Sequence, residues 1–212
     1  NNREIMKIAV HSIKGKETTK KVDLSKDIFG VEPNDHAIYL DVKQYLASQR
    51  LGTHSSKERG AVKGSRRKLR KQKGSGAARV GDIKNPLFRG GGRVFGPRPR
   101  KYDFKVNKKV KRLARKSALS YKLTQNNIIV VEDFNFDNPS TKNYSSTLAN
   151  FDVLNNKTVL VLDKPNKNIF LSSRNLSRAK VVLASELNTY DIMNANKMLF
   201  VESSIKEIEN NF

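Results

Sequence analysis

The chain contains no cysteine and only three histidines among its 212 residues. Without cysteine there is no disulfide bond, no thiol nucleophile and no cysteine-ligated metal site, which fits a reducing compartment. The three histidines, His11, His36 and His54, are scattered without the spacing of metal ligands. We therefore expect each histidine in a structural or surface position, and we expect no metal site.

Long apolar segments are also missing. No run of 18 apolar residues occurs, so no transmembrane helix is expected. The first ten residues, NNREIMKIAV, lack the apolar core of a signal peptide. The sequence thus predicts a protein without a membrane partner.

Motifs that would mark an enzyme are absent as well. The run Gly90-Gly91-Gly92 lacks the Gly-Lys-Ser/Thr ending, the preceding strand and the following helix of a phosphate-binding loop. No serine lies in a nucleophile elbow. Glu132, Asp133 and Asp163 follow apolar runs and could bind a metal in an α/β enzyme, but capping of the next loop explains them equally well. We expect neither an enzyme nor a cofactor.

The positive charge of the chain is concentrated in one segment, residues 57–116. This segment contains 23 Lys and Arg against three acids, Glu58, Asp82 and Asp103, for a net charge of +20, while the whole chain carries +22. Because burial of an unpaired ammonium or guanidinium group costs several kcal/mol, the segment must lie in water or against a polyanion. With a pI of about 10.2, nucleic acid is the first candidate, ahead of an anionic membrane surface.

The centre of this segment has an unusual composition. Residues 60–101 hold nine of the twelve glycines, and their few large apolar residues show no period of 3.6 or 2. Phe88, Phe95 and Tyr102 are interleaved with arginines; such rings stack on bases and guanidinium groups bind phosphates. We interpret residues 57–103 as an extended basic loop that threads into RNA and becomes ordered on binding; the alternative is a flexible basic linker.

The rest of the chain, residues 1–56 and 104–212, is predicted to form one globular α/β body. A β-hairpin is expected from residues 7–13 and 20–24, and helices at 34–52 and 104–124 flank the loop. Further strands are predicted at residues 128–132, 158–163, 169–171, 180–184 and 198–201, with helices at 140–151, 173–178, 189–196 and 203–210. Strands that alternate with helices indicate a mainly parallel sheet flanked by helices.

The two helices that flank the loop each carry one predicted inner face. The first face consists of Ile38, Val42, Tyr45 and Leu46, and the second of Val106, Val110, Leu113, Ser117 and Tyr121. Basic residues cover much of the remaining surface of the second helix. Because that helix continues directly from the loop, we favour phosphate contact over a merely solvated face.

An ordered series of short motifs resembles the large-subunit ribosomal proteins of the universal L-four family, in their bacterial form. The series consists of Gly52-Thr53, KERGAV (57–62), Gly64, KQKGSGAAR (71–79), Pro86, FRGGG (88–92), FGP (95–97) and KVNKK (105–109). It covers roughly residues 52–120, and IIVVEDF (128–134) and IFLSSRNL (169–176) are consistent with it further along the chain.

The resemblance implies a structural constituent of the large ribosomal subunit in the cytoplasm, which binds large-subunit (23S) rRNA early in assembly. It also implies that the loop lines part of the polypeptide exit tunnel. The implied partners are the rRNA, neighbouring large-subunit proteins including the L-twenty-two family protein, and the nascent chain.

The predicted RNA-binding residues lie in the loop and in the helix that follows it. They are Lys57, Arg59, Lys63, Arg66, Arg67, Lys68, Arg70, Lys71, Lys73, Arg79, Lys84, Phe88, Arg89, Arg93, Arg98, Arg100, Lys101, Lys108, Lys109, Arg112, Arg115 and Lys116. The tunnel-proximal tip is expected at Lys71, Gln72, Lys73, Gly74, Ser75, Gly76 and Arg79.

Two other functional classes remain open at this point. One is a free RNA-binding regulator of transcription or translation, which high salt would wash off large subunits. The other is an α/β nucleotide-dependent enzyme with a basic substrate arm, which a nucleotide titration would detect.

Overall fold

The computed structural model describes residues 5–211, and the chain divides into two compact units. The first unit, called the body below, comprises Asn1–Leu46 and Lys105–Phe212. The second unit, called the loop, comprises Ala47–Phe104. Beyond the end of one helix at Ser48, residues 49–104 of the loop lie in no helix or strand.

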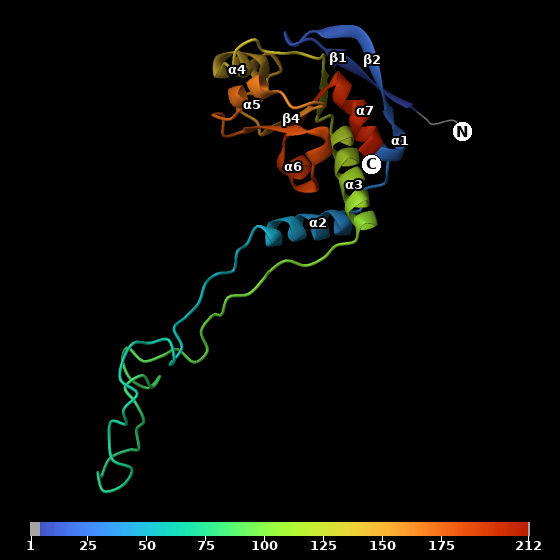
Figure 1. Ribbon diagram of the computed structural model, residues 1–212. Helices are drawn as coiled ribbons and strands as arrows, with labels where there is room; N and C mark the ends of the chain where they lie inside the picture. The colour runs from blue at the N-terminus through green and yellow to red at the C-terminus, as the bar shows by residue number, and fades with distance from the viewer. Residues whose placement is uncertain (1–4, 212) are drawn as a thin grey trace. The chain divides into compact units, whose positions relative to one another are not determined.

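The body is built on one six-stranded sheet (Figure 1). Its strands are β1 (Ile5–His11), β2 (Glu17–Ser25), β3 (Ile128–Val131), β4 (Thr158–Leu162), β5 (Ala179–Leu183) and β6 (Lys197–Val201), in the order β2-β1-β3-β6-β4-β5. The β1–β2 hairpin is antiparallel, and every other neighbouring pair is parallel. The mainly parallel sheet and the N-terminal hairpin that the sequence predicts are therefore confirmed.

The central strands are buried on both faces, as their continuous apolar sequences require. In β4 all five residues are buried, and Val159 and Val161 belong to a different hydrophobic cluster from Leu160 and Leu162. This alternation follows from the period of two in a strand. The sheet consequently has two separate cores, one on each face.

Helices cover both faces of the sheet (Figure 1). The cluster around Val159 includes residues of α1 (Lys26–Phe29), α2 (Asp35–Ser48), α3 (Lys108–Thr124), α6 (Thr189–Asn194) and α7 (Glu202–Asn211). The cluster around Leu160 includes residues of α4 (Thr141–Asn150) and α5 (Lys167–Ser173). A 3-10 turn, Ala184–Glu186, follows β5. Among the described residues, no helix is long and apolar enough to cross a membrane.

One stretch folds differently from its prediction. Residues 169–171 were expected to form a strand, but they lie in α5, and the expected helix at 173–178 is replaced by the end of α5 and turns. Asn166 explains the difference, because its side chain accepts hydrogen bonds from the backbone of Asn168 and Ile169 and so starts a helix at this point. A short apolar run such as Ile-Phe-Leu does not distinguish strand from helix by periodicity.

The helices on either side of the loop are shorter than predicted. The first, α2, begins at Asp35 and ends at Ser48 rather than near 52, and α3 begins at Lys108 rather than at 104. Leu46 and Leu113, both predicted inner-face residues, are 44% and 37% exposed. In α3 the predicted Ser117 is buried and Tyr121 packs against the core, but Ala114, Ala118 and Leu119 are also buried and were not predicted. Small residues form much of this face, so a pattern of large apolar residues defined it only in part.

Candidate nucleic-acid interface

The helix α3 has a cationic first half and a buried second half. Lys108, Lys109 and Arg112 are exposed, Arg115 and Lys116 are half-buried, and no acid lies in the first turn. Positive charge near a helix N-terminus opposes the helix dipole, and like charges four residues apart cost about 0.2–0.5 kcal/mol per pair. The arrangement therefore destabilises α3, and a polyanionic partner would remove that cost.

Hydrogen bonds from the inner side of α3 hold the helix in place. The Tyr121 hydroxyl donates to the Asp35 carboxylate over 2.6 Å, and Ser120 Oγ donates to the Val31 carbonyl over 2.7 Å. The hydrogen bond to Asp35 is also the main reason that the pKa of the Tyr121 hydroxyl is raised. These bonds join α3 to the start of α2 and so fix the position of α3, including its cationic half, on the body.

Two lysines of α3 donate hydrogen bonds to other groups of the body. Lys122 is buried, and its Nζ donates to the Ala195 carbonyl over 2.6 Å. Burial lowers the pKa of its ammonium group. Lys111 Nζ donates to Gln44 over 2.9 Å. Neither residue belongs to the predicted RNA-binding set.

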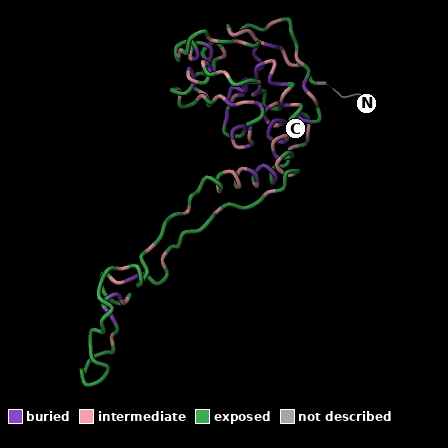
Figure 2. The backbone as a smooth tube through the Cα atoms, viewed as in Figure 1, coloured by how far each residue is buried: buried purple, intermediate pink, exposed green. Residues whose placement is uncertain are grey.

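Backbone hydrogen bonds join two limbs of the loop side by side. These bonds run from Arg100 N to Gly52 O (3.1 Å), Ser56 N to Pro97 O (3.0 Å), Arg93 N to Lys57 O (2.9 Å) and Leu69 N to Gly81 O (2.8 Å). The segment between the limbs, residues 70–79, is exposed at every position (Figure 2). The predicted tip lies in this segment, at the turn between the limbs.

A small cluster, called the node below, lies within the loop and consists of three buried residues, Asp82, Lys84 and Gly92, and the exposed Arg59. In residues 49–104, all of which the structure describes, Asp82, Lys84 and Gly92 are the buried positions (Figure 2). Arg59 Nη2 donates to Asp82 Oδ2 over 3.1 Å. A Cβ at position 92 would come within 2.3 Å of the Arg59 backbone nitrogen, so the limbs approach closely only because residue 92 is glycine.

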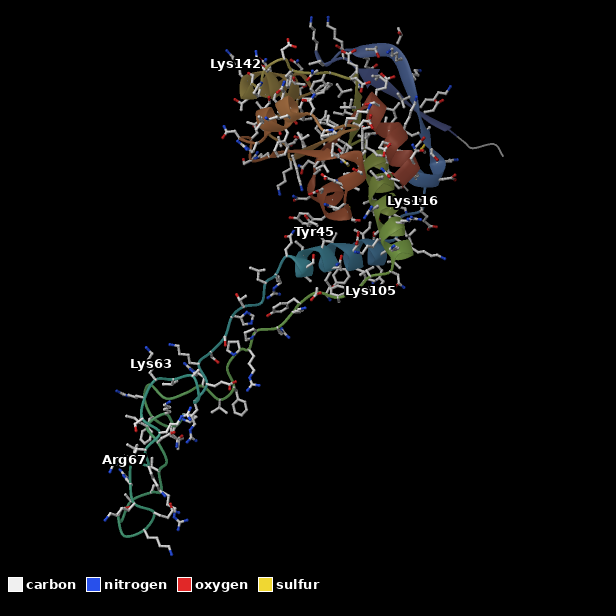
Figure 3. All side chains as sticks on the ribbon, in the orientation of Figure 1. Tyr45, Lys63, Arg67, Lys105, Lys116 and Lys142 are labelled. Atoms are coloured by element: carbon white, nitrogen blue, oxygen red, sulfur yellow. The ribbon has the colours of Figure 1, made fainter. Side chains whose placement is uncertain are left out.

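Apart from Lys84, which is buried, the structure separates the predicted loop cations into two groups. Some already have partners within the loop: Arg59 binds Asp82, Arg98 binds Glu58 over 2.6 Å, Lys68 donates to Gln72, and Arg100 lies over the Tyr102 ring. Eleven others are exposed, without a side-chain partner in the described part of the chain: Lys57, Lys63, Arg66, Arg67, Arg70, Lys71, Lys73, Arg79, Arg89, Arg93 and Lys101. Lys63 and Arg67 are labelled in Figure 3. This second group is the set that can bind phosphate without breaking an internal contact.

The aromatic residues of the loop also differ in availability. The guanidinium groups of Arg50 and Arg100 lie 3.8 and 4.5 Å from the centre of the Tyr102 ring, so this ring already has partners within the loop. Phe88 is 38% exposed, and Phe95 is fully exposed. The predicted site includes Phe88 but omits Phe95, although the exposure of Phe95 makes it the better stacking surface for a base. The interleaving of Phe95 with arginines in the sequence is the signal that points to it.

Three of the acids and histidines considered for a metal site, Glu132, Asp133 and His11, have structural contacts. Glu132 accepts a hydrogen bond from the backbone of Ile13, and Asp133 accepts two from Ser203. His11 packs edge-on against Phe151. Within residues 5–211, no three His, Asp or Glu side chains gather in a way that could hold a metal ion. Capping thus accounts for Glu132 and Asp133.

Comparisons with known proteins agree with these features. The model of the ribosomal protein L4/L1 family matches residues 22–211. The chain is 58% identical to the large ribosomal subunit protein uL4 of Christiangramia forsetii over 204 residues, which cover 96% of this chain and 98% of that protein. It is 57% identical to the uL4 protein of Flavobacterium johnsoniae (97% and 99% covered) and 58% identical to that of Phocaeicola vulgatus (97% and 99% covered). The chain therefore belongs to the ribosomal protein L4/L1 family, in its bacterial form, and its role is that of a structural ribosomal protein rather than an enzyme.

Proposed function

We propose that this protein binds 23S rRNA in the large ribosomal subunit through its loop and the first half of α3. In this proposal the loop tip, residues 71–79, lines part of the polypeptide exit tunnel. One observation carries the proposal: eleven exposed, unpartnered cations lie in the loop, whose 58 residues carry a net charge of +14 out of the +22 of the whole chain. Phosphate contacts supply much of the affinity of such surfaces, and arginines bind phosphate bidentately.

Family membership supplies the setting for this proposal. A bacterial protein of this family works in the cytoplasmic ribosome as part of the large subunit. Residues 57–103, folded out and back, give about twenty extended residues per limb, which span at most roughly 70 Å. That reach is enough for the tip to meet the tunnel wall, the neighbouring protein of the L-twenty-two family and the nascent chain while the body stays elsewhere on the subunit.

A crosslinking map of assembled large subunits tests the proposal. A photoreactive amino acid would replace Lys73 at the tip, Arg112 on α3, or Lys142, an exposed cation on α4 that serves as the control (Figure 3). We expect the first two positions to crosslink to 23S rRNA, and the tip also to a stalled nascent chain. Lys142 should give no crosslink to either.

Two outcomes would contradict the proposal. If position 73 crosslinks no more rRNA than position 142, the loop does not contact rRNA. If the protein leaves large subunits during a high-salt wash, the protein is a free regulator rather than a structural constituent.

A further inference from the structure

A cavity of about 580 Å³ lies between the two limbs of the loop, next to the tip. Its lining includes five cations, Lys63, Arg67, Lys68, Lys84 and Arg89, and no acid. Resting on the RNA-binding function proposed above, we propose that this cavity binds one unstacked nucleotide of the RNA. The phosphate would lie at Lys84 and the base against Leu69 and Ile83.

The side chain of Lys84 is the first reason for this assignment. Lys84 is 7% exposed, whereas the other lysines and arginines of the loop are exposed. Its ammonium group has no hydrogen bond or ion pair in the fully described loop, and Asp82, the nearby buried acid, binds Arg59 instead. The Nζ atom of Lys84 keeps contact with solvent, and because no group of the protein binds it, it is available to bind an anion that enters the cavity.

The remaining lining indicates more than an inorganic anion. Leu69 and Ile83 are 49% and 52% exposed and form an apolar wall beside the cations. The volume lies within the range of about 300–1,000 Å³ that is usual for small-ligand sites. A nucleotide fits both the cationic and the apolar part of the lining, because its phosphate binds the ammonium group and its base covers the aliphatic side chains.

The positions of the other cations favour a nucleotide within a chain over a free one. Lys63 and Arg67 lie on one limb beside the cavity and Arg89 on the other, and all three are exposed. They can bind the phosphates that precede and follow the inserted nucleotide, as in other surfaces that bind single strands. An acidic protein segment would satisfy the charges but would leave the apolar wall without a matching group.

The cavity is formed by the loop's own hydrogen bonds. Gly92 N donates to Lys84 O over 3.0 Å, and Leu69 N donates to Gly81 O over 2.8 Å. Gly64, with φ at 151°, lies against Ile83 and Lys84, and a Cβ there would stand 3.3 Å from Ile83 Cγ2. Contacts within the loop thus shape the site, and such preorganisation reduces the entropy lost on binding.

Binding of the full-length chain to purified 23S rRNA, combined with chemical probing of each base, tests the inference. Lys84→Met removes the charge but keeps a flexible aliphatic side chain, and Leu69→Ser removes part of the apolar wall. Lys101→Met is the control, because Lys101 is an exposed loop cation outside the cavity lining. We expect Lys84→Met to weaken binding about tenfold or more, as loss of a charged hydrogen bond does, and Lys101→Met to weaken it several times less.

Chemical probing supplies the readout that a general loss of charge would not change. The wild-type complex should protect one particular base, which becomes reactive with both Lys84→Met and Leu69→Ser but stays protected with Lys101→Met. Equal affinity losses and identical protections for all three variants would overturn the cavity assignment while leaving RNA binding intact. Ultraviolet crosslinks from residues 62–69 or 81–90 to another protein in assembled subunits, rather than to RNA, would also overturn it. Failure of the wild-type chain to bind the rRNA would instead refute the proposed function.

Discussion

Deletion of most of the loop should leave the body folded. The structure suggests removal of residues 57–96 and closure with a short Gly/Ser linker, because Ser56 N and Pro97 O are only 3.0 Å apart. No buried hydrophobic side chain of the described chain lies between Ile38 and Ala114. The deletion therefore removes nothing from either core, and the helical content and melting temperature of the body should change little.

The same deletion should have a large and calculable effect on the salt dependence of RNA binding. It removes 13 Lys and Arg and two acids, Glu58 and Asp82. If about half of the cations neutralise phosphates, roughly six contacts are lost, and each contributes about 0.7–0.9 to the log–log slope. The slope should become shallower by about 4 to 5. Between about 50 and 200 mM salt, the wild-type affinity should thus fall roughly 250- to 1,000-fold more than that of the deletion variant.

Filter binding of both proteins to 23S rRNA over this salt range, with circular dichroism of the free proteins, measures both effects. Some binding should survive in the deletion variant, because Lys108, Lys109 and Arg112 remain on α3. An unchanged slope would show that the loop cations do not contact phosphate. An unfolded body would show that the loop is part of the core, which would refute the division of the chain into a body and a loop.

Three further predictions concern the body. Lys108→Gln combined with Arg112→Gln should weaken rRNA binding but raise the free energy of unfolding by about 0.5–1 kcal/mol, measured in urea, because repulsion within α3 is relieved. Phe200→Ala should lower the free energy of unfolding by about 3–5 kcal/mol, because Phe200 is 1% exposed and packs edge-on against Phe29; a loss below 1 kcal/mol would contradict the assigned core. Because burial lowers the folded-state pKa of Lys122, the unfolded chain binds more protons than the folded one between that pKa and the ordinary value of 10.5. Stability should consequently rise with pH in that window, and Lys122→Met should abolish this rise in urea titrations.

Much of the fold could be predicted because the central strands are continuous apolar runs with distinct ends. The runs that became β3, β4, β5 and β6 were placed within one or two residues of their observed bounds. The residues of α5 were missed because one side-chain cap at Asn166, rather than periodicity, decides their conformation. The inner face of α3 was predicted only in part, because the buried Ala114 and Ala118 add no large apolar residue to the pattern.

The candidate site shows a different limit of sequence reasoning. The charge count located the basic segment, since no core can hold a net charge of +20. It could not tell which cations are free, because that depends on pairs distant in the sequence, such as Arg59 with Asp82 and Arg98 with Glu58. Nor could it find the buried position of Lys84, which depends on the close approach of two limbs at Gly92.

The node leads to a final prediction about the free protein. The sequence predicts that the loop orders on binding RNA, since few apolar residues offset about 1–2 kcal/mol of backbone entropy per ordered residue. At the node, an ion pair and several hydrogen bonds join the two limbs of the loop. We therefore expect trypsin to cut the node more slowly than the rest of the loop. Cleavage should begin in residues 66–79, and the bond after the buried Lys84 should be cut last.

Mass spectrometry of a timed trypsin digest gives the order of cleavage. The same digest of the Gly92→Val variant shows how cleavage changes when the node is disrupted. A valine Cβ would stand 2.3 Å from the backbone nitrogen of Arg59, so this substitution should separate the limbs at the node. Cleavage after Lys84 should then become as fast as cleavage after Arg79, while the melting of the body stays unchanged. If Lys84 is cut as early as the tip in the wild-type protein, the node does not persist in solution. In that case the cavity beside the node would have to form together with the RNA, and the affinity lost by Lys84→Met would include the cost of ordering the loop.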